Sequence, residues 1–136
     1  MTTSADEILG DAAIPELLEA IDPIQPEDVA VVPTPAFMIR GWARDVDAMT
    51  IGSTIYLRPG LFESERRRLV DLIVHELVHV RQWGERTAGS FLSRYLGQYL
   101  LARLRGAGHH VAYRSIGAEV EAREVSATIR RLLDDQ

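Results

Sequence analysis

The pattern H-E-L-V-H at residues 75–79, set in an uninterrupted apolar segment, constrains the fold of this chain more than any other feature. The segment LVDLIVHELVHV, residues 69–80, contains no glycine or proline, which favours an α-helix. Because a helix turns about 100° per residue, His75 and His79 would lie about 40° apart on one face. Two imidazoles presented in this way can bind one metal ion, and Glu76 borders the same face. The pattern therefore predicts a metal-binding helix.

The opposite face of this helix carries the residues that we expect to enter the core. Counted from His75, an apolar stripe lies roughly 180° away, and it consists of Val70, Ile73, Leu77 and Val80. We therefore expect a helix from about residue 64 to residue 83, with Gly84 as its C-cap and the histidines facing a cleft. The alternative is a buried structural helix whose histidines are satisfied by hydrogen bonds.

The composition is that of one ordinary globular domain. The chain has 136 residues, 46% apolar and 26% charged, with no cysteine, so disulfides and thiolate metal sites are excluded. No apolar run approaches the length of a membrane-spanning helix, and the N-terminal residues lack the pattern of a signal peptide. We therefore expect no membrane contact and, by default, a cytoplasmic location.

The positive charges do not indicate a nucleic-acid site. All fifteen cationic residues are arginines, and the short clusters at residues 66–68 and 130–131 have no aromatic residues between them. The sequence pI of about 5.3 also argues against an arginine-rich nucleic-acid binder. We expect these clusters to be solvated helix faces.

Residues 1–35 form a strongly acidic leader, with eight acidic and no basic side chains. The remaining residues, 36–136, carry fifteen arginines and twelve acidic residues, and we treat them as the domain that contains the motif. Within the leader, residues 5–21 predict one or two short amphipathic helices, and a proline-rich extended connector follows. The favoured interpretation is that the leader completes the core. The alternative is that it covers the cleft as an inhibitory segment.

The order of the other predicted elements indicates an α+β fold. Residues 36–42 predict a strand, and residues 49–51 and 54–57 flank a two-residue turn that suits a hairpin. Helices are expected at residues 90–105, with a wide apolar stripe, and at residues 117–133. A small antiparallel sheet followed by three helices belongs to the α+β class.

Catalytic zinc sites usually have three protein ligands, so a third ligand must come from outside the motif. The remaining histidines, His109 and His110, lie in a glycine-rich loop and are better explained as exposed surface residues. A carboxylate on the helix at residues 117–133 is the better candidate, and three are available there: Glu119, Glu121 and Glu124. Glu119 and Glu121 border the apolar stripe on opposite sides, so helix periodicity leaves these two nearly equal.

Several motifs resemble a family of small bacterial metallopeptidases. A strand with a T-x-G-x-x-I pattern and a P-G turn, a helix H-E-L-x-H-V-x-Q and a later E-x-E-A segment are similar to gluzincin-type domains. The chain most resembles the metallopeptidase core domain associated with extracellular contractile injection systems, over roughly residues 48–83 and 117–123. The residues that carry the resemblance are Thr50, Gly52, Ile55, Pro59, Gly60, His75, Glu76, Leu77, His79, Val80, Gln82, Glu119, Glu121 and Ala122.

The resemblance implies a zincin-like fold and a Zn²⁺ site formed by His75, His79 and Glu119. In related gluzincins the ligand glutamate is followed three residues later by alanine, as Glu119 is followed by Ala122. Those proteins often have aspartate at the next position, where this chain has Arg123. The ligands would then have to be oriented by another group.

The function implied is zinc-dependent hydrolysis of peptide bonds. Zinc would polarise the scissile carbonyl, and Glu76 would take a proton from water and deliver it to the leaving amine. Tyr113 and Arg123 are candidates to stabilise the developing oxyanion. The substrate is expected to be a peptide or protein that adds to the edge of the strand at residues 54–57.

Two polar residues flank the histidines on their helix face. Gln82 and Asp71 are both candidates to orient a ligand, but Asp71 lies four residues after Arg67, which predicts a surface ion pair.

A second functional hypothesis is a non-catalytic, zinc-stabilised accessory domain of a bacterial injection-type particle. Such a domain would keep the ligands without efficient turnover, and the departure at Arg123 supports this alternative. No feature of the sequence indicates an oligomeric state.

Overall fold

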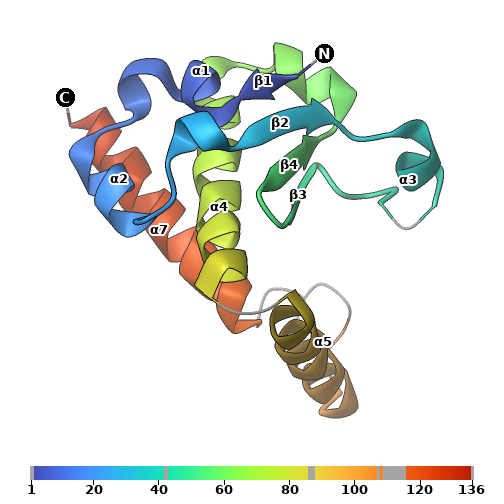
Figure 1. Cartoon of the computed structure of the whole chain (residues 1–136). Coiled ribbons are helices and arrows are strands. Elements are labelled where there is room, and N and C mark those ends of the chain that lie inside the picture. The colour runs from blue at the N-terminus through green and yellow to red at the C-terminus, as the bar shows by residue number, and fades with distance from the viewer. Residues whose placement is uncertain (1, 42, 86–87, 107, 109–115, 136) are drawn as a thin grey trace.

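In the computed structural model, residues 2–41, 43–85, 88–106, 108 and 116–135 are described, and they form the α+β architecture that the sequence predicts (Figure 1). The sheet has four short strands in the order β1-β2-β4-β3. Their bounds are Thr3–Ser4 for β1, Ala30–Pro33 for β2, Ala48–Ile51 for β3 and Thr54–Leu57 for β4. β2 and β4 run parallel, and the other neighbouring strands run antiparallel. The sheet is therefore mixed, and the prediction of an antiparallel sheet is wrong in this respect.

Two long helices lie side by side next to the sheet. α4, Arg66–Glu85, packs against β3 and β4, and α7, Gly117–Asp134, runs along α4 on the side away from these strands (Figure 1). Both helices confirm the elements predicted from hydrophobic periodicity, with shifts of one or two residues at most of their ends.

The predicted C-cap at Gly84 is wrong, because α4 continues through this glycine to Glu85. The last turn is stabilised by an ion pair, since Arg81 Nε lies 2.9 Å from Glu85 Oε1. Glycine within a helix costs only about 0.5–1 kcal/mol relative to alanine, so it does not force the helix to end.

The two short helices of the leader have local start and stop signals. Ser4 caps α1, Ala5–Leu9, because its hydroxyl accepts a hydrogen bond from the Glu7 N–H. Gly10, with φ 53°, ends that helix, and a 3₁₀ turn follows over Gly10–Ala12. α2, Pro15–Ala20, begins with a proline at a position where no backbone N–H is needed. The prediction of one or two short helices within residues 5–21 is therefore confirmed, with two helices separated between Gly10 and Pro15.

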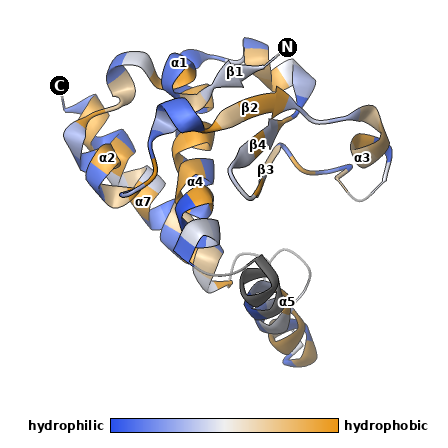
Figure 2. Ribbon diagram, viewed as in Figure 1, coloured by the Kyte–Doolittle hydropathy of each residue, from blue (hydrophilic) through white to orange (hydrophobic). Residues whose placement is uncertain are grey.

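The leader contributes directly to the hydrophobic core. α1 packs against α4 and α2 packs against α7, and β2 is coloured as hydrophobic over most of its length in Figure 2. The fully buried side chains of the leader that join the same cluster as α4 are Ala5, Leu9, Leu17, Ile21, Val29 and Val31. This burial is what the core-completing interpretation expects.

The segment around the prolines differs from the prediction in two ways. The connector expected to be merely extended contains a 3₁₀ turn, Pro26–Asp28, and then β2, which pairs with β1 and β4. The strand expected at residues 36–42 is instead the short helix α3, Ala36–Arg40, and Trp42 lies outside the described residues. The hydrogen bonds of α3 are local, from the N–H groups of Met38 and Ile39 to the Pro35 carbonyl. An apolar run without a neighbouring strand to pair with gives no β-structure.

The predicted hairpin of β3 and β4 is confirmed. Ile51 pairs with Thr54 across Gly52, whose φ is 64°, and Ser53 has no positive φ, which is the pattern of a type II′ turn. β4 is an inner strand because β2 and β3 flank it, and its Ile55 and Leu57 are fully buried. The expectation that a peptide adds to residues 54–57 is therefore wrong, since both edges of that strand are already paired.

The predicted helix at residues 90–105 is confirmed as α5, Ala88–Leu104. It lies apart from the sheet in Figure 1 and packs against the ends of α4 and α7. Part of its apolar stripe stays in solvent, since Leu96, Leu100 and Leu104 are at least half exposed. Among the described residues, no helix combines the length and the apolar character needed to cross a membrane.

Candidate metal centre

The helix α4 places the motif as its periodicity predicts. The apolar stripe enters the core, where Val70, Ile73, Leu77 and Val80 are all buried. The histidine side chains lie on the opposite side and differ in depth, with 23% of His75 and 8% of His79 exposed. Their ring centroids are 5.0 Å apart. The two imidazoles thus stand one helical turn apart at the edge of the core.

The third member of the site comes from α7. Glu119 Oε2 lies 3.1 Å from His75 Nε2, and Glu119 Oε1 lies 3.1 Å from His79 Nε2. One donor atom from each of the three residues lies within 4.8 Å of the other two, which is close enough for all three to hold one metal ion. Within the described part of the chain, no other group of three such side chains is found.

The packing of α7 on α4 separates the glutamates that periodicity left nearly equal. Glu119 turns towards the histidines and is almost fully buried, whereas Glu121 turns the other way and pairs with Arg81. Glu124 is exposed and is not part of the cluster. The structure therefore brings Glu119, and neither of the other two, to the histidines.

Glu76 lies against the edge strand of the sheet. Its side chain is buried, and its Oε2 accepts a hydrogen bond of 3.0 Å from the Thr50 hydroxyl of β3. The same hydroxyl lies 3.2 Å from the Glu76 carbonyl oxygen. Burial raises the pKa of the Glu76 carboxyl, although the nearby His79, His75 and Thr50 oppose this effect. Glu76 is thus a fixed carboxylate whose raised pKa makes it a better proton acceptor than an exposed glutamate.

The charges of the cluster depend on one another. Burial tends to raise the pKa of Glu119, but hydrogen bonds from His75 and His79 outweigh it and lower that pKa. Burial tends to lower the pKa of His79, but the hydrogen bond with Glu119 and the charges of Glu76 and Glu119 raise it to about 9. Without a metal, the buried carboxylate is therefore neutralised by a protonated imidazole.

This pairing predicts that the chelator-treated protein loses stability as the pH rises. Because the pKa of His79 is about 9 in the folded chain and ordinarily 6.5, its contribution is complete below pH 6.5 and disappears as the pH passes 9. The raised pKa of Glu76 acts in the same direction at lower pH. We expect a loss on the order of 3 kcal/mol in the free energy of unfolding, measured by urea denaturation. Equal stability at pH 6.5 and 9.5 would contradict the pairing.

Two further side chains contact the cluster. Gln82 Oε1 lies 2.7 Å from His79 Nδ1, so this residue, expected from sequence to orient a ligand, does meet a histidine. Tyr95 of α5 donates a hydrogen bond of 3.2 Å to Glu119 Oε1. Sequence reasoning assigned Tyr95 only to an apolar stripe, and its hydroxyl carries no signal that would have identified this contact.

The remaining site predictions have mixed outcomes. Tyr113, His109 and His110 lie outside the described residues. Arg123 is half-buried on α7, one turn beyond Glu119, and its role in stabilising an oxyanion stays a prediction.

The ion pair predicted between Asp71 and Arg67 is wrong. Asp71 Oδ2 lies 2.8 Å from Arg130 Nη1, whereas Arg67 pairs with Asp134. Both partners come from α7, so the charges on this part of α4 connect two helices that the sequence alone could not place side by side.

A cavity of about 300 Å³ opens beside the cluster, between α4, α5 and α7. Its wall includes Gln82 and Tyr95, which contact His79 and Glu119, together with Arg94, Gln98 and Ile116. None of the three donor residues lines the cavity, so it meets the cluster only through Gln82 and Tyr95.

Comparison with known proteins adds one finding to this geometry. No curated protein matches the chain, and no solved structure matches it. A family model does match residues 23–87, a region that includes β2, the hairpin and α4 with its two motif histidines, and that ends before Glu119. Residues 23–87 are thus similar to the eCIS core domain, where eCIS stands for extracellular contractile injection system.

Proposed function

We propose that the chain is a zinc-dependent metallopeptidase, with His75, His79 and Glu119 as the metal ligands. The observation that carries the proposal is the meeting of these three donors from two helices. The donor set suits zinc, because two imidazole nitrogens and one carboxylate oxygen are ligands that zinc prefers in catalytic sites. Zinc bound there would act as a Lewis acid, polarising a peptide carbonyl and making water more acidic.

Glu76 is the residue proposed to move protons. Its carboxylate is held by Thr50, it follows His75 directly in sequence, and it interacts electrostatically with both histidines. In the proposed reaction it accepts the proton of the attacking water and then gives this proton to the leaving amine. The Thr50 hydroxyl fixes the carboxylate without adding charge, so the carboxylate needs little reorganisation during the reaction.

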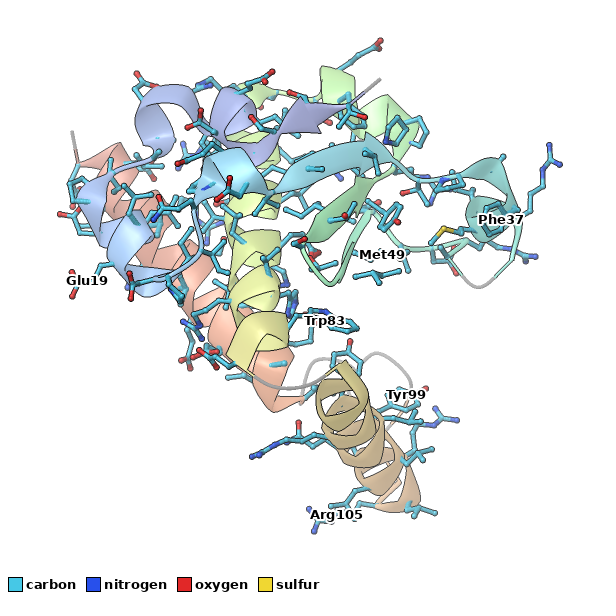
Figure 3. All side chains as sticks on the ribbon, viewed as in Figure 1. Glu19, Phe37, Met49, Trp83, Tyr99 and Arg105 are labelled. Atoms are coloured by element: carbon cyan, nitrogen blue, oxygen red, sulfur yellow. The ribbon has the colours of Figure 1, made fainter. Side chains whose placement is uncertain are left out.

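The proposed substrate is an extended peptide that lies along β3. In the β3–β4 ladder, Ile51 pairs next to the turn and Arg58 N–H bonds to the Asp47 carbonyl. In an antiparallel ladder every second residue bonds to the neighbouring strand, so Asp47, Met49 and Ile51 face β4. The backbone N–H and C=O groups of Ala48 and Thr50 therefore point away from β4, to the open edge of β3. Figure 3 shows Met49 of β3 and Trp83 of α4 on the same side of α4 in this view, away from α7. Binding through the backbone would give little sequence selectivity.

A second candidate function is a zinc-stabilised accessory domain without efficient turnover. The similarity of residues 23–87 to the eCIS core domain is compatible with this candidate as well as with the first, and the departure at Arg123 supports it. In that case the three ligands would serve to hold α4 and α7 together.

Elemental analysis and a protease assay on the same sample distinguish these proposals. We expect about one zinc per chain and cleavage of an unstructured protein such as casein, which stops after chelation and returns with zinc. Zinc at one per chain without cleavage would favour the accessory domain. Absence of bound metal after dialysis against zinc would contradict both.

A further inference from the structure

A row of polar contacts leads from the surface of α7 to the buried ring of His79. Gln82 Oε1 lies 2.7 Å from His79 Nδ1, and Gln82 Nε2 lies 2.7 Å from Glu121 Oε1. The same Nε2 lies 3.2 Å from the Ala118 carbonyl oxygen. Gln82 and His79 are both buried, so the contact between these two side chains is made in a region from which water is largely excluded.

The partners of Gln82 determine which way its amide points. The Ala118 carbonyl and the Glu121 carboxylate can only accept hydrogen bonds, so the NH₂ group of Gln82 must face them. The amide oxygen therefore faces His79, and because this oxygen can only accept, Nδ1 of His79 must carry a proton. The other ring nitrogen, Nε2, is then the one directed at Glu119.

Arg81 keeps Glu121 in the ionised, accepting form. Its guanidinium pairs with the Glu121 carboxylate and donates a second hydrogen bond of 2.7 Å to the Ala20 carbonyl. Partial burial tends to raise the pKa of Glu121, but the hydrogen bond from Gln82 and the interaction with Arg81 lower it. Glu121 is therefore a carboxylate that accepts from two neighbours on α4.

We propose that Gln82 is a positioning residue for His79, and that Glu121 and the Ala118 carbonyl orient it so that Nε2 of His79 is free to bind the metal. The inference rests on the proposed function, since it gives the ring orientation a purpose. It also gives Glu121 a role distinct from that of a ligand. In this chain the carboxylate acts on the histidine indirectly, through an amide.

A purely structural role for Gln82, as a tie between α4 and α7, predicts different behaviour. Removing such a tie would lower the free energy of unfolding and would leave the imidazole tautomer and the metal affinity unchanged. A positioning role predicts changes in both of these properties. The two roles can therefore be separated by measurements made on the folded protein.

The first measurement is the tautomer of His79, read from ring ¹⁵N chemical shifts in the full-length, chelator-treated Glu119→Ala variant. This background is needed because in the wild type the Glu119 carboxylate lies 3.1 Å from Nε2 and competes with Gln82 for the single proton of a neutral ring. At a pH where the ring is neutral, we expect it to be protonated at Nδ1 in Glu119→Ala and to be a mixture of both tautomers when Gln82→Ala is added. A ring protonated at Nε2 in Glu119→Ala, or an unchanged ring after Gln82→Ala is added, would overturn the proposal.

The second measurement is zinc affinity by competition with a chromophoric chelator. We expect Gln82→Ala to bind zinc about 10- to 100-fold more weakly. Glu121→Ala should show a smaller loss, about 3- to 10-fold, because the Ala118 carbonyl remains. Glu121→Gln should bind almost as the wild type, since its amide oxygen can still accept from Gln82.

The matched control is Glu85→Ala, which removes another carboxylate from Arg81 without touching Gln82. Its zinc affinity should equal that of the wild type, and a loss as large as that of Gln82→Ala would overturn the proposal. If Gln82→Ala does not fold, Glu121→Ala, which alters an exposed residue, supplies the decision. If the wild-type protein binds no zinc but the ring in Glu119→Ala is protonated at Nδ1, the proposed function is refuted while the orientation of the ring by Gln82 is supported.

Discussion

Replacing Glu76 by glutamine is expected to leave zinc bound and to remove nearly all peptidase activity. Glu76 is not among the three donors of the cluster, so the metal content should stay close to one per chain. The amide cannot accept a proton from water, and losing a general base typically lowers the rate by about 10²- to 10⁴-fold. The volume and the hydrogen bond from Thr50 are largely kept, because glutamine has the same shape and retains an accepting oxygen.

The measurements are zinc content by elemental analysis and the initial rate of peptide cleavage by the zinc-loaded protein. Glu124→Gln on α7 is the control, because it removes one carboxylate from an exposed site outside the cluster. Activity at the wild-type level in the Glu76→Gln variant would refute the proposed proton transfer. Loss of zinc in this variant would show that Glu76 supports binding instead.

Removal of residues 1–30 is expected to unfold the protein. The deletion takes away α1, α2 and the fully buried Leu9, Leu17 and Ile21. Truncating a single buried leucine or isoleucine to alanine costs about 2–5 kcal/mol, and a domain of this kind is stable by only about 5–15 kcal/mol. The loss of these three side chains alone is therefore comparable to the whole free energy of folding. Circular dichroism and thermal unfolding of the truncated chain test this expectation.

The same deletion tests whether the acidic leader inhibits the site. A truncated protein that stays folded and cleaves faster than the full chain would support the inhibitory interpretation. As a control, Glu16→Gln and Glu19→Gln neutralise exposed charges of α2 without touching the core. We expect these two substitutions to leave both activity and stability within a small margin of the wild type.

Elements whose evidence is local could be predicted from the sequence. The helix over the H-E-x-x-H motif follows from a stripe of apolar residues at helical spacing, and the hairpin follows from Gly52 between two short apolar runs. The presence of a third ligand on the last helix could be predicted too, since zinc chemistry requires one and carboxylates are available there.

Features that depend on contacts far apart in the chain could not be predicted from local patterns. Helix periodicity does not separate Glu119 from Glu121, because both border the same apolar stripe, and the prediction of Glu119 comes from the family resemblance. In the structure the choice is made by the rotation of α7 on α4. β2 was missed because its partners lie more than twenty residues away in sequence. The apolar pattern of α3 is also compatible with a strand. The segment forms a helix because none of the described strands lies beside it to pair with.

Arg81 connects the N-terminal segment to His79 through a short series of polar contacts. Its guanidinium donates to the Ala20 carbonyl at the end of α2 and also pairs with the Glu121 carboxylate. Glu121 in turn accepts a hydrogen bond from Gln82, and Gln82 contacts His79. A binding partner that lifts α2 away from the body would break the first of these contacts and release the guanidinium. The metal affinity would then depend on contacts made by α2, which in Figure 1 lies away from β3, where the substrate is proposed to bind.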